Sequence, residues 1–308
     1  MAENCRSLVD TAVAEVGKAL LGKERQLRLA FCCLLADGHL LIEDLPGMGK
    51  TTLSYALAQV LGLSYQRVQF TSDLLPADIL GLSVYHREDS SFQFHPGPIF
   101  TQVLLADEIN RSTPRTQSAL LEAMAERQVT LEGETRKLPE PFFVIATQNP
   151  LEQSGTYPLP ESQLDRFLMR IQLGYPDLAA ERDMLKNGFG GAQHLTLEQR
   201  IDAQQLASVR SAVNDVHAAD SLLDYVQRLA GRSRQGGEFA IGLSPRGILA
   251  LLRCAKTWAL MDDRDHVLPD DVQAVLPAVV GHRLQAGGSF SGDGMALVAL
   301  LQREVEVL

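Results

Sequence analysis

Two glycines, a lysine and two threonines stand close together in the first part of the chain, in a pattern suited to holding phosphate. Residues 43–52 read EDLPGMGKTT. The glycines let the backbone bend so that its N–H groups converge on phosphate oxygens, and the following helix offers its positive N-terminal end to the same anion. Lys50 would reach the β- and γ-phosphates, and the Thr51 hydroxyl would bind Mg²⁺. The predicted nucleotide-binding residues are Gly47, Met48, Gly49, Lys50, Thr51 and Thr52.

The loop departs from the standard pattern G-x-x-x-x-G-K-[ST] at one position, because Asp44 stands where the first glycine belongs. We expect the anion cradle to survive this change, since the later glycines, the lysine and the threonine are all present. The alternative, a chance glycine-rich turn, predicts no second motif at the right distance along the chain. The chain does contain further motifs, and they complete the same chemistry.

Two further apolar stretches end in polar residues that suit cleavage of a γ-phosphate. Residues 103–108 read VLLADE, so Asp107 stands at the tip of a predicted strand, where it can hold Mg²⁺ directly or through a water. Glu108 is placed to polarise an attacking water. The stretch 142–147, FFVIAT, leads to Asn149, which can hydrogen-bond the γ-phosphate or that water. An Asp-Glu or Asn-Pro turn alone is ordinary, but together these residues predict ATP hydrolysis with Mg²⁺.

The motifs require strands and helices in alternation. We predict strands at 39–43, 67–70, 103–107, 142–147 and 169–173, and helices at 51–61 and 114–127. Near-continuous apolar strands are typical of a parallel sheet covered on both faces, so the predicted class is α/β with flanking helices. Segments 74–98 and 128–138 alternate in polarity and predict inserted hairpins. Helical periodicity dominates later, which predicts an α/β core over residues 1–175 and an all-helical domain over 176–308.

Composition excludes several classes of protein. The 308 residues carry a formal net charge of −10, and 45% of them are hydrophobic, which is ordinary for a globular chain. No apolar run approaches the ~20 residues of a membrane helix, and the first residues do not form a secretory signal. The four cysteines form no C-x-x-C pair, so we expect buried, reduced thiols in a cytoplasmic protein. The histidines show no zinc-site spacing, and the acidic balance argues against coating of DNA.

The order of the motifs resembles that of the AAA+ ATPases, and several longer sequence segments resemble one family within that group. LIEDLPGMGKTTL, QFTSDLLPADILG, FHPGPIF, LLADEINRSTPRTQSALLEAMAERQVT and LSPRG are similar to the MoxR family. The similarity covers roughly residues 22–246. It implies a P-loop core with a helical lid, and hairpins at 74–98 and 128–138 that project toward the pore of a ring.

The resemblance also implies roles for residues outside the three motifs. Arg166, in LDRF, matches the arginine finger, which neutralises charge on the γ-phosphate in the neighbouring subunit. Arg170 is a rival for that role, and a surface pair of Arg166 with Asp165 is the plainer alternative. Arg246, in LSPRG, matches the second sensor, acting on its own or the neighbouring nucleotide, unless it is an ordinary helix-start arginine. Gly22 matches a loop beside the adenine, although a glycine between helices is also a plain C-cap.

The function that the resemblance implies is a chaperone-like ATPase. MoxR proteins form rings, commonly hexamers, and remodel or activate a partner protein that often carries a von Willebrand factor A domain. A magnesium-chelatase-type ATPase subunit and a nucleic-acid motor of the MCM-like branch are the alternatives. The second hairpin is nearly neutral and no basic stripe interleaved with aromatics is present, so no nucleic-acid partner is expected. A small-molecule kinase fits the motif set least well.

Overall fold

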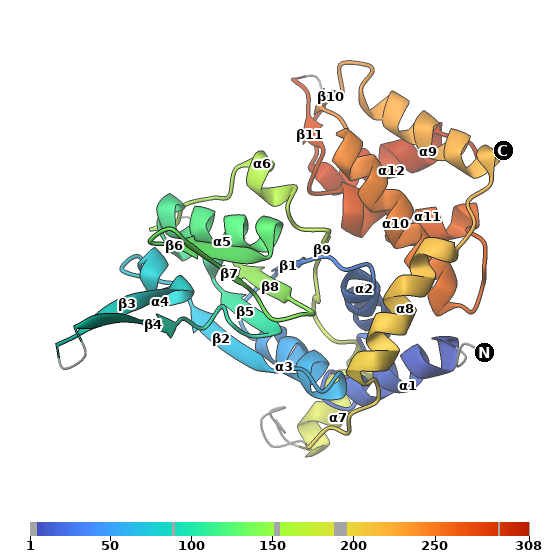
Figure 1. Ribbon diagram of the computed structural model, residues 1–308. Coiled ribbons are helices and arrows are strands. Elements are labelled where there is room, and N and C mark those ends of the chain that lie inside the picture. Colours follow the sequence, from blue (N-terminus) through green and yellow to red (C-terminus); the bar gives the residue numbers. More distant parts are fainter. Residues whose placement is uncertain (1–4, 88–89, 151–154, 188–195, 289, 308) are drawn as a thin grey trace.

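The computed structural model describes residues 5–87, 90–150, 155–187, 196–288 and 290–307. A five-stranded parallel sheet lies at its centre, in the order β2-β5-β8-β1-β9 (Figure 1). The strands are β1 (Leu40–Glu43), β2 (Tyr65–Gln69), β5 (Val103–Asp107), β8 (Phe143–Gln148) and β9 (Met169–Ile171). The predicted class is confirmed: a parallel sheet flanked by helices. Each predicted strand is present, with its ends shifted by a few residues at most.

The central strands are apolar along their whole length because helices cover both faces of the sheet. Leu40 and Ile42 enter the core shared with the helices on one face, and Leu41 points into the core on the other face. The helices on the first face are α1 (Cys5–Gly17), α2 (Glu24–Leu35) and α3 (Lys50–Val60). The second face is covered by α5 (Pro114–Glu126).

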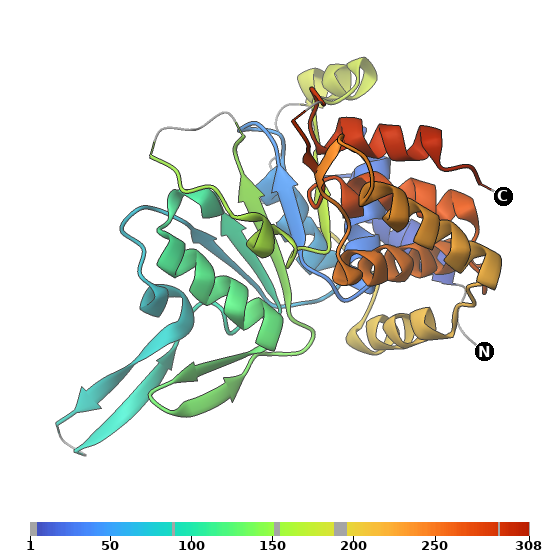
Figure 2. The same cartoon turned by 90° about the horizontal axis from the view of Figure 1, so that it is seen from above.

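Two hairpins extend from the sheet domain and lie side by side in both views (Figures 1 and 2). The first consists of β3 (Gly81–His86) and β4 (Ser91–Pro96) after the short helix α4 (Pro76–Leu80), and the second of β6 (Gln128–Leu131) and β7 (Glu134–Lys137). The Arg136 guanidinium lies over the Phe94 ring, 4.0 Å from its centroid, and so joins the hairpins. Phe92, by contrast, is 70% exposed.

The C-terminal part is a group of helices packed beside the sheet domain (Figure 1). It contains α8 (Ala203–Asp215), α9 (Asp220–Ser233), α10 (Pro245–Met261), α11 (Pro269–Val280) and α12 (Gly294–Glu304). Helix α7 (Leu178–Asn187) lies apart from them, where its Ala180 neighbours Gly22. The sequence analysis did not foresee the short antiparallel pair β10 (Phe239–Ile241) and β11 (Gln285–Ala286), which joins these helices. Strands this short carry too little alternation to be read from sequence.

Helix α10 is the part of this group that matters most for the site. It begins after Ser244, whose hydroxyl accepts a hydrogen bond from the Gly247 N–H at 3.0 Å, and it has proline in its first turn. Near its other end the Arg28 side chain of α2 lies over the Trp258 ring and pairs with Asp262 at 2.6 Å. These contacts hold α10 against the sheet domain.

The four cysteines are free and buried, as the sequence predicts, and the Cys32 thiol lies 3.4 Å from the Cys254 carbonyl oxygen. Burial raises the pKa of Cys32 and Cys33 well above the usual range of a thiol. Such thiols pack as small apolar groups. None of the helices in the described ranges is both long and apolar enough to cross a bilayer.

Candidate functional site

The loop between β1 and α3 has the conformation that its glycines allow. Gly47 and Gly49 have φ angles of 82° and 91°, which favour glycine. A Cβ on Gly49 would also lie 2.5 Å from Cδ1 of Leu20, so a larger residue would require the Leu20 side chain to move. Helix α3 begins at Lys50, so its N-terminal end, where backbone N–H groups have no acceptor within the helix, borders the loop.

Asp44 explains why the loop holds its shape without its first glycine. Its φ is not in the positive range, so the position makes no special demand on the backbone. One carboxylate oxygen accepts a hydrogen bond from the Leu45 N–H at 2.8 Å, and the other accepts one from the Gly174 N–H at 2.6 Å. Its carbonyl oxygen accepts a hydrogen bond from Lys50 Nζ at 2.7 Å. Asp44 thus ties the loop to the lysine and to the segment after β9.

The polar residues at the ends of β5 and β8 are joined by one hydroxyl. Thr147 Oγ1 donates to Asp107 Oδ1 at 2.6 Å and accepts from the Glu108 N–H at 2.8 Å. Thr147 is fully buried, and Glu108 has a positive φ of 56°. The sequence analysis missed Thr147. The signal was a single hydroxyl near the end of an otherwise apolar strand.

Strand β2 supplies two further contacts that the sequence analysis missed. Arg67 pairs with the second Asp107 carboxylate oxygen at 2.7 Å, and Gln69 Nε2 donates to Glu108 Oε2 at 2.7 Å. The Arg111 side chain lies 3.2 Å from the same glutamate oxygen. Both carboxylates are therefore held in set directions by neighbours on the adjacent strand and the following turn.

The strand order brings the three predicted motifs to one edge of the sheet. β5, β8 and β1 are neighbours and parallel, so Asp107, Asn149 and the phosphate loop all follow carboxyl ends of adjacent strands. Asn149 is buried. The Gln148 carbonyl oxygen lies 3.4 Å from Lys50 Nζ, and its buried Nε2 atom finds no acceptor among the described residues.

The donor set at this edge suits magnesium. The Thr51 hydroxyl and the Asp107 carboxylate are hard oxygen ligands of the kind that Mg²⁺ prefers. Within the described ranges no group of three or more His, Cys, Asp or Glu side chains could hold a metal ion. A divalent cation at this edge would therefore need phosphate oxygens and waters as additional ligands.

Gly22 lies beside this edge. Its φ is 69°, and a Cβ there would stand 3.0 Å from Cβ of Ala180. Helix α1 ends at Gly17, so Gly22 is not its C-cap. The next residue, Lys23, is buried and donates to the Tyr175 carbonyl oxygen at 2.5 Å; burial lowers the pKa of its ammonium group. This turn thus fills the space between the phosphate loop and the start of the C-terminal helices.

Comparison with known proteins agrees with this geometry. Residues 39–169 match the ATPase family associated with various cellular activities (AAA), and residues 231–302 match the AAA lid domain. The uncharacterized protein YeaC of Bacillus subtilis is 42% identical over 97% of this chain and 94% of its own length. Chaperone MoxR1 of Mycobacterium tuberculosis is 40% identical over 90% of this chain and 75% of its own length. The chain belongs to the MoxR family of AAA+ ATPases.

A solved structure supports the same assignment. A crystal structure described as that of a presumed ATPase from Cytophaga hutchinsonii has a TM-score of 0.89 to this chain at 33% identity. The match covers 99% of this chain and 96% of the other. The whole arrangement of sheet, hairpins and C-terminal helices is therefore shared with this solved protein.

The arginines that the MoxR resemblance singles out lie at a different place. Arg166 and Arg246 both line a pocket of about 370 Å³, together with residues 37–39; we call it the arginine pocket because Arg127, Arg253 and Arg283 line it too. Arg166 donates to the Leu121 carbonyl oxygen at 2.7 Å, and Arg246 is 68% exposed, 3.7 Å from Asp165. Residues 37–39 precede β1, whereas the phosphate loop follows it. None of the described residues lining this pocket belongs to the phosphate loop.

The span of β1 separates the two places. A strand rises about 3.3 Å per residue, so the ends of β1, from Leu40 to Glu43, lie roughly 10 Å apart. Arg170 stands on β9 beside this strand and pairs with Glu43 at 3.0 Å. It faces the strand end that leads into the phosphate loop of its own chain, and it does not line the arginine pocket.

The arginine pocket is strongly cationic for an acidic protein. Its lining contains five arginines but only two aspartates. The buried Arg283, at the end of the α11 segment, donates to Asp165 Oδ1 at 2.7 Å and to the Phe167 carbonyl oxygen at 2.8 Å, so it holds the turn that carries Arg166. His39 is neutral here, because burial lowers its pKa to about 4. The pocket is therefore suited to an anion.

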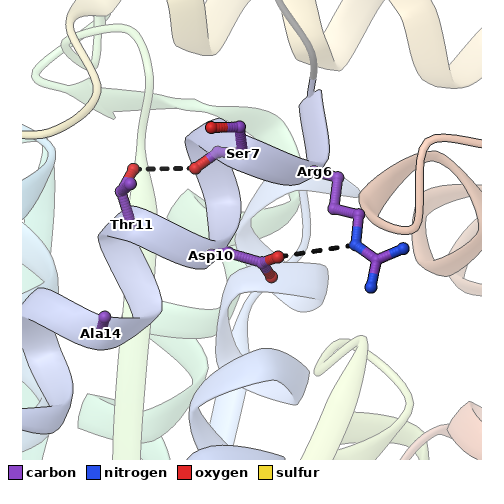
Figure 3. A pocket seen from close by; sticks show the side chains of 5 residues that line it. All are labelled: Arg6, Ser7, Asp10, Thr11 and Ala14. Carbon is purple, nitrogen blue, oxygen red and sulfur yellow. Dashed lines mark hydrogen bonds and ion pairs between the residues drawn. The ribbon is translucent and has the colours of Figure 1, made fainter.

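A second concavity, of about 430 Å³, lies on the surface of α1 and is shown in Figure 3. Its lining residues all come from that helix, and the contacts among them join neighbouring turns: Arg6 with Asp10 at 3.6 Å, and the Thr11 hydroxyl with the Ser7 carbonyl oxygen at 2.9 Å. It is larger than the arginine pocket but contains none of the motif residues. We assign it no part in the chemistry.

Proposed function

We propose that this MoxR-family protein hydrolyses ATP to ADP and phosphate at the sheet edge formed by the phosphate loop, Asp107, Glu108 and Asn149. The supporting observation is that three separate stretches of sequence, the phosphate loop and the ends of β5 and β8, meet there and are joined by the hydrogen bonds of Lys50 and Thr147. Thr51 and Asp107 are the residues that would hold Mg²⁺, which supplies positive charge to the phosphate oxygens when bound.

The side chains at this edge divide the work of hydrolysis. Lys50 Nζ donates hydrogen bonds to two carbonyl oxygens, those of Asp44 and Gln148. A neutral carbonyl binds an ammonium group more weakly than a charged phosphate does, so a phosphate can replace these acceptors. Glu108 accepts hydrogen bonds from neighbours through one carboxylate oxygen, so its carboxylate is oriented to accept the proton of an attacking water. Asn149 is a neutral partner for that water or for the γ-phosphate. Gly22 and its turn border the adenine.

We further propose that Arg166 and Arg246 act on the nucleotide of a neighbouring protomer. The location of their pocket supports this, because it opens before β1 while the protomer's own phosphate loop follows β1. The arginine pocket and the phosphate loop, at opposite ends of one strand, suit a head-to-tail contact between protomers, and such a contact gives a ring when its rotation closes. A hexamer is the ring size that the family resemblance implies. Arg166 is favoured over Arg170, whose guanidinium pairs with Glu43 of its own chain.

The output that we propose is remodelling or activation of a partner protein, one that carries a von Willebrand factor A domain. The partner class rests on the MoxR resemblance alone. The first hairpin exposes Leu82, Tyr85 and Phe92, which suits contact with a protein surface. Arg136 of the second hairpin is engaged with Phe94 and Glu134, so it offers no free charge for nucleic acid. A cytoplasmic location stays a prediction.

The first test is turnover and assembly together. Glu108→Gln should retain ATP without cleaving it, and its mass by light scattering with ATP and Mg²⁺ should approach that of six protomers. Arg166→Ala should still bind ATP but hydrolyse it at least tenfold more slowly, while Arg170→Ala should keep more of its turnover. A monomer that hydrolyses ATP as fast as the assembled protein would contradict the proposed action in a neighbouring site.

A further inference from the structure

Asp37 joins arginines from both parts of the molecule at one end of the arginine pocket. It lies in the turn between α2 and β1 with a φ of 58°, a conformation that Asp and Asn adopt more readily than most residues. Its carboxylate lies 2.5 Å from Arg127, which follows α5. It also lies 2.9 Å from Arg210 on α8 and 3.8 Å from Arg253 on α10. One carboxylate thus faces three guanidiniums.

These groups are partly withdrawn from water, which makes their charges harder to screen. The Asp37 side chain is 22% exposed and that of Arg210 is 15% exposed, whereas the side chains of Arg127 and Arg253 are 37% and 46% exposed. Burial is the largest cause of the lowered pKa of Arg210, and the guanidiniums of Arg127 and Arg253 lower it further. Without Asp37, the three positive charges would repel one another and push α8 and α10 away from the sheet domain.

Helix α10 connects this carboxylate to the second-sensor position. Arg246 and Arg253 stand at i and i+7 of the helix with Ala250 between them, so all three share one face and line the pocket. A displacement of the helix at Arg253 therefore moves Arg246 as well. Arg166 comes from the sheet domain, so the distance between Arg166 and Arg246 depends on how α10 is held.

We propose that Asp37 is a positioning residue for the arginines that act on the neighbouring nucleotide. It holds α10 at the end of the sheet where Arg166 lies, and so sets the spacing between Arg166 and Arg246. This inference rests on the proposed function, because it assumes that these two arginines reach a nucleotide bound by another protomer.

The direct test compares two neutralised aspartates. Asp37→Asn keeps the backbone, since asparagine also tolerates a positive φ. Asp262→Asn is the matched control, because Asp262 also ties α10 to the sheet domain, through Arg28 at 2.6 Å, but lies outside the pocket. We expect Asp37→Asn to lower turnover at saturating ATP about tenfold. The dissociation constant for ATP should hardly change, the unfolding midpoint should fall because the guanidiniums lose their counter-charge, and Asp262→Asn should stay within about twofold of the wild-type turnover.

Mixed rings locate the defect. Lys50→Ala protomers bind no nucleotide but carry intact arginines, so mixing them with Asp37→Asn protomers should raise turnover above that of either variant alone. Arg166→Ala mixed with Lys50→Ala is the reference for action in a neighbouring site. If the reference mixture shows no gain, the proposed action of Arg166 on a neighbouring nucleotide fails, and the positioning role of Asp37 fails with it. If it gains while the Asp37→Asn mixture does not, or if Asp262→Asn is as slow as Asp37→Asn, the positioning role is refuted and the proposed function stands.

Discussion

Replacing Thr147 with valine removes one hydroxyl that serves both acidic residues of the site. Valine has nearly the same shape, so little volume changes, but Asp107 loses a donor at 2.6 Å and the Glu108 N–H loses an acceptor at 2.8 Å. Both groups are left without this partner beside a fully buried side chain. An unsatisfied buried polar group costs about 1–3 kcal/mol, and more when it is charged.

We therefore expect Thr147→Val to lower the free energy of unfolding by about 3 kcal/mol, measured by urea denaturation. Turnover of ATP should fall at least tenfold, because the positive-φ backbone of Glu108 is no longer anchored to β8. Thr147→Ser is the control: it keeps the hydroxyl and loses one methyl group, which costs about 1 kcal/mol. The reasoning would be wrong if the valine variant were as stable and as active as the serine variant.

Two other predictions use the loop and the buried histidine. Gly49→Ala should weaken ATP binding in a fluorescent-nucleotide titration, because its Cβ would lie 2.5 Å from Cδ1 of Leu20. Gly133→Ala is the control, since Gly133 has a similar φ of 83° but no atom within 4 Å of the added Cβ. This control should lose about 1–2 kcal/mol of unfolding free energy and bind ATP unchanged. Equal binding by the two variants would exclude the steric explanation. The pKa of His39 is about 4 in the folded chain, below its ordinary 6.5. Between pH 6.5 and pH 4 the unfolded chain therefore binds more protons than the folded chain. The free energy of unfolding should fall by up to about 3 kcal/mol as the pH drops through this range. His39→Gln, which can still pair with the backbone, should flatten this slope in denaturant titrations at pH 7 and pH 5; an unchanged slope would place the lost stability elsewhere.

Local chemistry explains which parts of the fold could be predicted from sequence. The apolar stretches at 103–107 and 142–147 became β5 and β8 because a strand covered on both faces must be apolar along its length. The phosphate loop could be recognised because Gly49 and Lys50 are required by local backbone geometry and by the anion. The short pair β10 and β11 was missed, since its few residues carry no pattern of their own.

In the candidate site, too, some features were predictable from the sequence and others were not. The sequence by itself determined which residues carry charge and which strands end in Asp107, Glu108 and Asn149. Only the tertiary structure decided their partners, because contacts such as Thr147 to Asp107 join separate strands and depend on the strand order. The arrangement of the arginine pocket depends on the tertiary structure even more strongly. A carboxylate before β1 faces guanidiniums from three distant helical segments, and no spacing along the chain encodes that meeting, since it arises when α8 and α10 pack against the sheet domain.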